Sequence, residues 1–234
     1  MDLQKTAAVV TGASQGIGLV LAQQLIAAGA TVAGVARSED DLARVAETLG
    51  ERFRPTPADV SDADAIQTAI DGVANDLGRL DVLVNNAGFG RFDPVDALDL
   101  EAWRGQIDVN LSGAFYATRA AVPHMKAAGR GHIVHVGSIA GLIGNPELSA
   151  YNASKFGLRG FAEATMKELR PHGIKTTYVA PGSVDTGFGA KAGHDANPNA
   201  MPPEAVAAAI LHVLQTPDST LISELVMRPM QTKG

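Results

Sequence analysis

The stretch "TGASQGIG" (Thr11 to Gly18) follows the apolar run "AAVV" and precedes a segment rich in Leu, Ala and Gln. Its glycines, Gly12, Gly16 and Gly18, fall in the turn between an expected strand and an expected helix. Glycine permits a tight turn and lets a diphosphate approach the backbone, while the helix N-terminus behind it offers unpaired N–H groups. The stretch therefore predicts a dinucleotide-binding turn; the alternative is an ordinary glycine-rich turn.

The rest of the chain alternates between short β-rich runs and longer helical patterns. This alternation predicts parallel strands joined by right-handed helical crossovers. We therefore expect one domain, residues 1–234, with an α/β, doubly wound Rossmann fold: a seven-stranded, mainly parallel sheet with helices on both faces and the ligand at the carboxyl ends of the strands. The expected strands are residues 7–10, 31–35, 53–57, 81–84, 132–136, 175–179 and 224–227, and the expected helices are 17–28, 39–49, 62–77, 103–127, 152–170 and 203–215.

Two of these helices carry start signals. The segments "SEDD" (38–41) and "SDAD" (61–64) each place a serine three residues before an acidic residue. This spacing is typical of a capping box, or at least of an acidic first turn. We expect Ser38 and Ser61 to begin the helices that follow them.

Composition excludes several classes of function. The chain has 234 residues, 46% of them hydrophobic, a net charge of -6 and no cysteine. The negative charge argues against a nucleic-acid surface, and the lack of cysteine excludes disulfides, thiolate metal sites and a cysteine nucleophile. The apolar runs are far shorter than the ~18 residues of a membrane span, and no signal peptide is visible. We expect a cytoplasmic protein with no metal, nucleic-acid or membrane partner.

The end of the second expected strand indicates which dinucleotide binds. The strand "TVAGV" runs into "ARSED", so Arg37 and Ser38 stand where an acid would accept hydrogen bonds from an adenosine ribose. A carboxylate there would repel a 2′-phosphate, whereas a guanidinium can pair with one through two hydrogen bonds. The sequence therefore favours NADP over NAD. The alternative is that Arg37 is a solvated surface residue.

A tyrosine and a lysine lie one helical turn apart in "SAYNASKFG" (149–157). On a helix, Tyr151 and Lys155 would share one face. Ser138 follows the strand run "HIVHV" thirteen residues earlier, and Asn110 lies inside the expected helix 103–127. A cation near a phenol favours phenolate and lowers a pKa that is ordinarily about 10, which would suit the phenol to proton transfer.

Together these motifs resemble the short-chain dehydrogenase/reductase family. The resemblance rests on "TGxxxGxG", on "NNAG" (85–88) and on the order Asn110, Ser138, Tyr151 and Lys155, and it covers essentially the whole chain. It implies that these four residues form the catalytic tetrad. Tyr151 would exchange a proton with the substrate oxygen, Ser138 would hydrogen-bond that oxygen, Lys155 would hold the nicotinamide ribose, and the main-chain carbonyl of Asn110 would hold a water at a helix kink.

The resemblance also implies the binding residues. Family members that prefer NADP often carry a basic residue before the middle glycine of the turn, where this chain has Ser14 and Gln15. The alternatives for Asp59 and Thr186 are helix-capping roles. The implied cofactor residues are Gly12, Ser14, Gly16, Ile17, Gly18, Arg37, Ser38, Asp59, Val60, Asn86, Ala87, Gly88, Tyr151, Lys155, Pro181, Gly182, Val184 and Thr186; the implied substrate residues are Ser138, Tyr151, Ile139, Leu148 and Phe188.

The expected activity is hydride transfer between NADP and a carbonyl or secondary alcohol. A 3-oxoacyl-thioester reductase-like activity is one specialisation, and small ketones or aldehydes are another. The alternatives are an NAD-preferring alcohol dehydrogenase of the same family and a non-catalytic dinucleotide-sensing protein. By resemblance, the apolar faces of helices 103–127 and 152–170 would pair with a second subunit, which predicts a homodimer or homotetramer.

Overall fold

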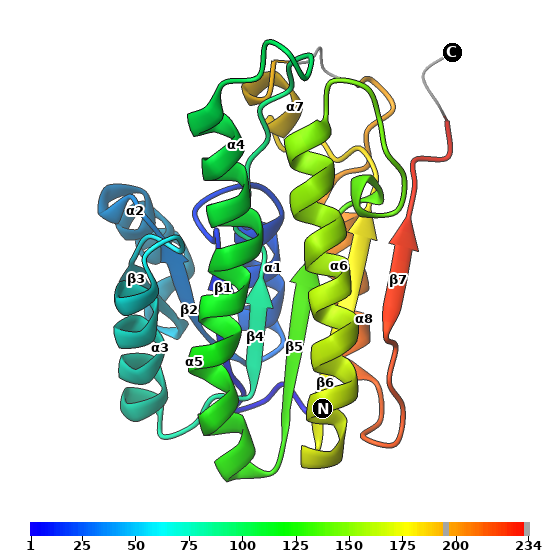
Figure 1. Ribbon diagram of the computed structural model, residues 1–234. Coiled ribbons are helices and arrows are strands. Elements are labelled where there is room, and N and C mark those ends of the chain that lie inside the picture. The colour runs from blue at the N-terminus through cyan, green and yellow to red at the C-terminus, as the bar shows by residue number, and fades with distance from the viewer. Residues whose placement is uncertain (194–196, 232–234) are drawn as a thin grey trace.

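A computed structural model describes residues 1–193 and 197–231, and its centre is a seven-stranded sheet in the order β3-β2-β1-β4-β5-β6-β7 (Figure 1). Each of the six strand pairings is parallel. The order reverses between β1 and β4, which is the switch point where open α/β sheets bind ligands. The predicted Rossmann fold is confirmed. The strands are β1 (Ala7–Thr11), β2 (Thr31–Ala36), β3 (Phe53–Pro57), β4 (Val82–Asn85), β5 (Gly131–Val136), β6 (Ile174–Pro181) and β7 (Glu224–Met227).

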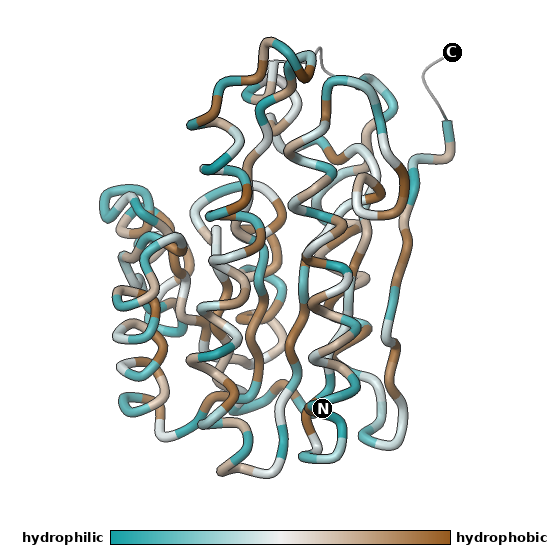
Figure 2. Tube along the Cα trace, viewed as in Figure 1, coloured by the Kyte–Doolittle hydropathy of each residue, from teal (hydrophilic) through white to brown (hydrophobic). Residues whose placement is uncertain are grey.

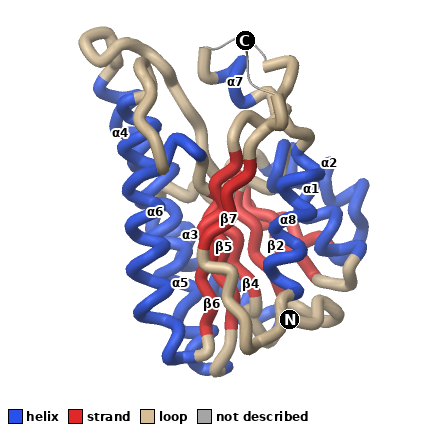
Figure 3. Tube along the Cα trace, turned by 90° about the vertical axis from the view of Figure 1, so that its right-hand side faces the viewer, coloured by secondary structure: helices blue, strands red, loops and turns tan. Residues whose placement is uncertain are grey.

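The helices cover both faces of the sheet. Figure 3 shows α3, α4, α5 and α6 on one side and α1, α2 and α8 on the other. The short helix α7 lies apart from these layers, above the carboxyl ends of the strands (Figure 1). The helices are α1 (Gly16–Ala27), α2 (Glu39–Leu49), α3 (Ala63–Leu77), α4 (Leu100–Ile107), α5 (Gly113–Ala128), α6 (Ser149–Leu169), α7 (Phe188–Lys191) and α8 (Pro203–Gln215).

The core consists of apolar side chains between the sheet and each helical layer. One cluster joins Leu21 and Leu25 of α1 and Ile210 of α8 to the sheet, and another joins Ile70 of α3 and Met125 of α5 to the opposite face. Figure 2 shows the resulting pattern, with brown concentrated in the central strands and teal alternating with brown along the helices. Burial on both faces explains why the strands read as continuous apolar runs.

Across residues 1–193 and 197–231, no helix combines the length and the apolar composition that a membrane crossing requires.

One of the two predicted serine caps is present. Ser38 begins α2, and its hydroxyl accepts a hydrogen bond from the Asp41 amide at 3.1 Å. The prediction for Ser61 is wrong, because Asp62 caps α3 by accepting from the amides of Asp64 and Ala65. Ser61 instead donates its hydroxyl to the Asp59 carboxylate at 2.7 Å, so its side chain is turned back toward β3.

The predicted helix 103–127 is a longer and interrupted element. It begins at Leu100, and residues 108–112 form one π-helical turn between α4 and α5. A π turn inserts an extra residue into the helix and often marks a functional site. Asn110, the residue expected at a kink, lies in the middle of this turn.

Candidate active site

The predicted site residues lie at one end of the sheet, where the parallel strands have their carboxyl ends (Figure 1). Each group belongs to the segment that follows a different strand, so the topology brings together residues that are far apart in the chain. These groups are residues 12–18 after β1, Arg37 and Ser38 after β2, Asp59 and Val60 after β3, residues 86–88 after β4, Ser138 and Ile139 after β5, and Pro181, Gly182, Val184 and Thr186 at and after the end of β6.

The glycine turn after β1 leaves room for a ligand against the backbone. Gly12 and Gly16 have φ values of 68° and 57°, in the left-handed region that favours glycine. A Cβ on Gly18 would lie 2.2 Å from the Gly12 carbonyl oxygen, so this position requires a residue without a side chain. Among the described residues no side chain caps the N-terminus of α1, which leaves its N–H groups available to an anion. These features fit the diphosphate of a dinucleotide.

Asn86 and Thr11 hold the glycine turn against the end of β4. The Thr11 hydroxyl accepts hydrogen bonds from the amides of Asn86 and Ala87, each at 3.0 Å, and the Asn86 side-chain amide donates to the Thr11 carbonyl at 2.9 Å. The adjacent Asn85 is buried and donates to Thr118 at 3.1 Å. These contacts agree with the interpretation that the asparagine amides tie strand ends together.

The end of β2 presents Arg37 to solvent. Within the described part of the chain, its guanidinium makes no hydrogen bond or ion pair, and its charge acts on Asp59. Burial raises the pKa of Asp59, but hydrogen bonds from Ser61 and the charge of Arg37 outweigh burial, so the net pKa is lowered. Val60 is buried and packs against Gly113, where a Cβ would lie 2.9 Å from the Val60 carbonyl oxygen.

Ser138, Tyr151 and Lys155 meet above the carboxyl end of β5. The Ser138 hydroxyl acts on the phenol of Tyr151, which lies in the first turn of α6, and favours a lower pKa of that phenol. Lys155 is buried one turn later, with its ammonium nitrogen 5.7 Å from the centre of the Tyr151 ring and 3.0 Å from the Val136 carbonyl oxygen, to which it donates. The structure therefore brings the predicted serine, tyrosine and lysine together.

The pKa values in this cluster differ from the expectation. Burial raises the pKa of Tyr151 to about 12, against the lowering effect of the Ser138 hydrogen bond. Burial also lowers the pKa of Lys155 to about 8. The expected lowering of the phenol pKa by the lysine is not present, because desolvation of the buried phenolate is the larger effect. At neutral pH the phenol is protonated and the ammonium is mostly charged.

Asn110 fixes the segment after β4. Its side chain bonds both the amide and the carbonyl of Phe89 at 2.9 Å and donates to Ser154 at 3.1 Å. Gly88 lies against this arrangement, since a Cβ there would be 3.0 Å from Asn110 Oδ1 and 3.6 Å from Lys155 Nζ. The π turn thus places Asn110 beside the cluster, with its side chain already satisfied.

Aromatic rings surround the Tyr151 phenol. Phe188 of α7 and Phe92 each lie 5.6 Å from the Tyr151 ring, centre to centre. The predicted substrate residues Ile139 and Leu148 are half-buried near Ser138 and the start of α6, whereas residues 194–196 of the loop expected to contain Phe188 lie outside the described residues. The site therefore has an apolar wall beside its polar cluster.

The α7 segment also folds over the glycine turn, which the sequence did not indicate. Lys191 donates to the Gln15 side chain at 2.7 Å and acts on the Asp41 carboxylate. Thr186 lies against Gly16, where a Cβ would be 3.1 Å from the Thr186 Cβ. Lys191 therefore brings a cation to the glycine turn, beside Gln15.

Asn152, between Tyr151 and Lys155, is a second residue whose role was not predicted. Its amide donates to the carbonyls of Ala140 and Ile143, and its oxygen accepts from the Asn145 amide at 3.1 Å. It ties the loop after Ser138 to α6. The spacing of residues in the sequence gives no such signal, because these contacts depend on how the loop folds.

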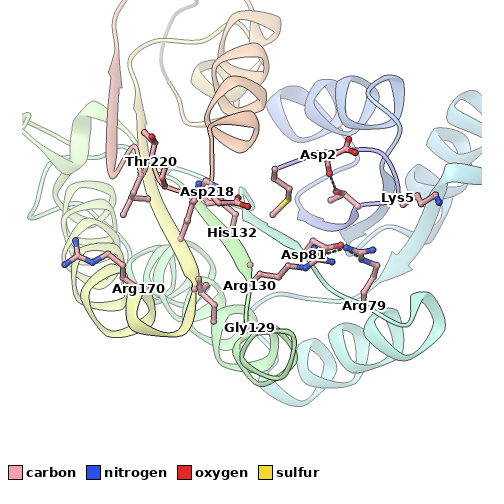
Figure 4. A pocket seen from close by; sticks show the side chains of 18 of the residues that line it. Asp2, Lys5, Arg79, Asp81, Gly129, Arg130, His132, Arg170, Asp218 and Thr220 are labelled. Atoms are coloured by element: carbon pink, nitrogen blue, oxygen red, sulfur yellow. Dashed lines mark hydrogen bonds and ion pairs between the residues drawn. The ribbon is translucent and has the colours of Figure 1, made fainter.

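A separate cavity of about 700 Å³ opens at the opposite end of the sheet (Figure 4). Three of its charged groups, Arg79, Asp81 and Arg130, are paired with one another. Arg79 donates to Asp81 at 2.6 and 2.8 Å, and Arg130 lies 3.5 Å from the same carboxylate. Asp81 also accepts from the Ala7 amide at 2.9 Å, which makes it a fold-stabilising residue at this end of the molecule.

Comparison with known proteins agrees with the geometry. A family model described as short chain dehydrogenase matches residues 6–197. An uncharacterized oxidoreductase of Staphylococcus saprophyticus is 32% identical over 98% of this chain and 100% of its own. The 3-oxoacyl-[acyl-carrier-protein] reductase of Vibrio harveyi is 35% identical over 80% of this chain and 76% of its own. A metagenomic short-chain oxidoreductase in complex with NADP is 35% identical, with a TM-score of 0.87 over 99% of this chain and 100% of its own.

The family model covers most of the chain, and the Staphylococcus relative aligns with nearly all of it. The sheet order, the glycine turn and the cluster of Ser138, Tyr151 and Lys155 are consistent with these matches. The chain belongs to the short-chain dehydrogenase family and is an oxidoreductase.

Proposed function

We propose that this protein is an NADP-dependent carbonyl reductase. The reverse reaction would oxidise a secondary alcohol. The observation that carries the proposal is the grouping of three side chains: the Ser138 hydroxyl acts to lower the pKa of the Tyr151 phenol, and the Lys155 ammonium lies 5.7 Å from the centre of the same ring. This cluster lies at the carboxyl edge of the sheet, on the side where the glycine turn offers a diphosphate site.

Tyr151 and Ser138 would act on the substrate oxygen. A reduced nicotinamide supplies the hydride that adds to the carbonyl carbon. As negative charge develops on oxygen, Tyr151 transfers its phenolic proton to it and Ser138 donates a hydrogen bond. The raised pKa of Tyr151, about 12, keeps the proton on the phenol until that charge develops.

Lys155 and Asn110 support this proton transfer. The ammonium beside Tyr151 would stabilise the phenolate that remains after the proton has left. Lys155 would also hold the nicotinamide ribose, and Asn110 would place a water next to Lys155 through its main-chain carbonyl. Return of a proton along this route would restore Tyr151 for the next turnover.

Two cations favour NADP over NAD. Arg37 is exposed at the end of β2 without a competing partner among the described residues, beside Ser38. Lys191 lies against Gln15 on the glycine turn. A 2′-phosphate has about two negative charges near neutral pH, and guanidinium and ammonium groups stabilise it where a carboxylate would repel it. The metagenomic relative was crystallised with NADP, which supports the same assignment.

The apolar wall of Phe92 and Phe188 suits a carbonyl with a hydrocarbon substituent. Similarity to the 3-oxoacyl-[acyl-carrier-protein] reductase supports a 3-oxoacyl thioester as one substrate class, with small ketones and aldehydes as the other.

Phe115 of α5 and Phe156 of α6 are 45% and 44% exposed, and we propose that a second copy of the chain covers them in a homodimer.

The experiment that tests the reaction compares the wild type with Tyr151→Phe. The wild type should oxidise NADPH with members of a carbonyl panel that includes 3-oxoacyl thioesters. The variant should lose activity by at least about 100-fold, because its ring cannot supply the proton. NADPH binding, followed by fluorescence, should be largely retained. A wild type that reduces no carbonyl and oxidises no alcohol would support the non-catalytic alternative.

A further inference from the structure

A second tyrosine lies beneath the cluster, on β6. Tyr178 is 3% exposed, and its hydroxyl faces the backbone of two residues of the proposed tetrad. It accepts a hydrogen bond from the Ser138 amide at 3.4 Å. It lies 3.2 Å from the Ser138 carbonyl and 3.5 Å from the Lys155 carbonyl, and its single proton can be donated to one of them at a time.

The surrounding backbone is shaped to the phenol. A Cβ on Gly137 would lie 2.2 Å from the Tyr178 ring, and a Cβ on Gly141 would lie 2.2 Å from its hydroxyl oxygen. Contacts this short do not occur in folded proteins, so both positions must lack a side chain while this tyrosine is present. Gly137 and Gly141 stand on either side of Ser138 in the sequence, so the segment that contains the serine packs closely against the Tyr178 ring.

These contacts hold the backbone of Ser138, whereas Tyr151 interacts with its side chain. The Ser138 backbone is extended, with φ -168° and ψ 160°, and its hydroxyl reaches both the Ala140 amide and the Tyr151 phenol. Without Tyr178, one face of the Ser138 peptide would lose its buried partner. An unpaired buried amide is costly, and relaxation of this peptide would move the serine hydroxyl.

We propose that Tyr178 is a positioning residue that acts through Ser138: its hydroxyl fixes the serine backbone so that the serine hydroxyl meets the substrate oxygen and Tyr151. This inference rests on the proposed reductase function. It differs from a packing role, because a packing role requires only the ring and not the hydroxyl.

The test is Tyr178→Phe, which keeps the ring and removes one oxygen. We expect kcat to fall about tenfold, the effect of one well-placed hydrogen bond, with little change in the Kd for NADPH. Tyr116→Phe, on α5 away from Ser138, is the matched control and should retain wild-type kcat. In a Ser138→Ala background, Tyr178→Phe should cause no further loss, because the hydroxyl that it positions is already absent.

Two kinetic outcomes would overturn the inference. One is an equal fold-loss from Tyr178→Phe in the wild-type and Ser138→Ala backgrounds; the other is an unchanged kcat. Hydrogen exchange at the Ser138 amide, measured by NMR, decides independently of activity: faster exchange in Tyr178→Phe supports the contact, and unchanged exchange contradicts it. If the wild type turns over no substrate, the proposed function fails, while the exchange measurement still tests the role of Tyr178.

Discussion

Asn110 holds the backbone of Phe89 at both of its polar groups. The Phe89 amide donates to Asn110 Oδ1 at 2.9 Å, and Asn110 Nδ2 donates to the Phe89 carbonyl at 2.9 Å. Asn110 is 1% exposed and lies in the π turn between α4 and α5, so an irregular helix and an irregular loop are joined through one side chain. The π turn is therefore coupled to the segment that follows β4, beside Lys155.

This relationship predicts a large effect of Asn110→Ala on stability. The substitution removes both contacts to Phe89 and one to Ser154, so the Phe89 amide and carbonyl lose these partly buried partners. We expect the free energy of unfolding, measured with urea, to fall by about 3 kcal/mol. Asn145→Ala, at an exposed loop position, is the control and should change it by less than about 0.5 kcal/mol. A loss below about 1 kcal/mol for Asn110→Ala would contradict the coupling.

The glycine turn predicts that Gly18→Ala impairs cofactor binding. The added Cβ would lie 2.2 Å from the Gly12 carbonyl oxygen and 2.6 Å from the Asn86 side-chain nitrogen, so the turn must change shape. We expect the Kd for NADPH, measured by fluorescence titration, to rise more than about tenfold. Gly72→Ala is the control: a Cβ there meets no atom of residues 1–193 or 197–231 within 4 Å, and alanine in this helix should stabilise the protein by up to about 1 kcal/mol. An unchanged Kd in Gly18→Ala would contradict this model of the turn.

Arg37→Asp tests the cofactor assignment. The substitution replaces the exposed cation at the end of β2 with a carboxylate, which repels a 2′-phosphate and accepts hydrogen bonds from ribose hydroxyls. We expect the ratio of kcat/KM for NADPH to that for NADH to fall by at least about 100-fold, since both effects act in the same direction. Lys191→Ala should lower the ratio less, because Lys191 is bound to Gln15 at 2.7 Å and is shared with Asp41. A wild type that prefers NADH, or equal losses with both cofactors, would overturn the assignment.

Sequence patterns predicted the fold because the alternation of apolar runs and helical segments is a local property. Helical spacing predicted that Tyr151 and Lys155 share one face, and the resemblance to the short-chain family predicted that Ser138 joins them. The features that were missed depend on three-dimensional packing. Tyr178 looks like an ordinary strand residue in "KTTYV", and only the register of β5 and β6 places it under Ser138. The raised pKa of Tyr151 was mispredicted for the same reason, since helical spacing brings Lys155 close but gives no measure of burial.

His135 predicts how stability depends on pH. It is fully buried on β5, where its Nδ1 lies 3.2 Å from the Asn85 amide, and burial together with the Lys155 charge lowers its pKa to about 3. Below pH about 6.5 the imidazole binds a proton in the unfolded chain but not in the folded chain. The contribution of the neutral imidazole to stability is therefore fully present above that pH and is lost as the pH decreases. His135→Leu removes this titration. As the pH decreases from 6 to 4.5, the free energy of unfolding of the variant should fall less steeply than that of the wild type. The difference between the two slopes should be about 1.4 kcal/mol per pH unit. Parallel slopes for wild type and His135→Leu would show that the buried imidazole is not responsible.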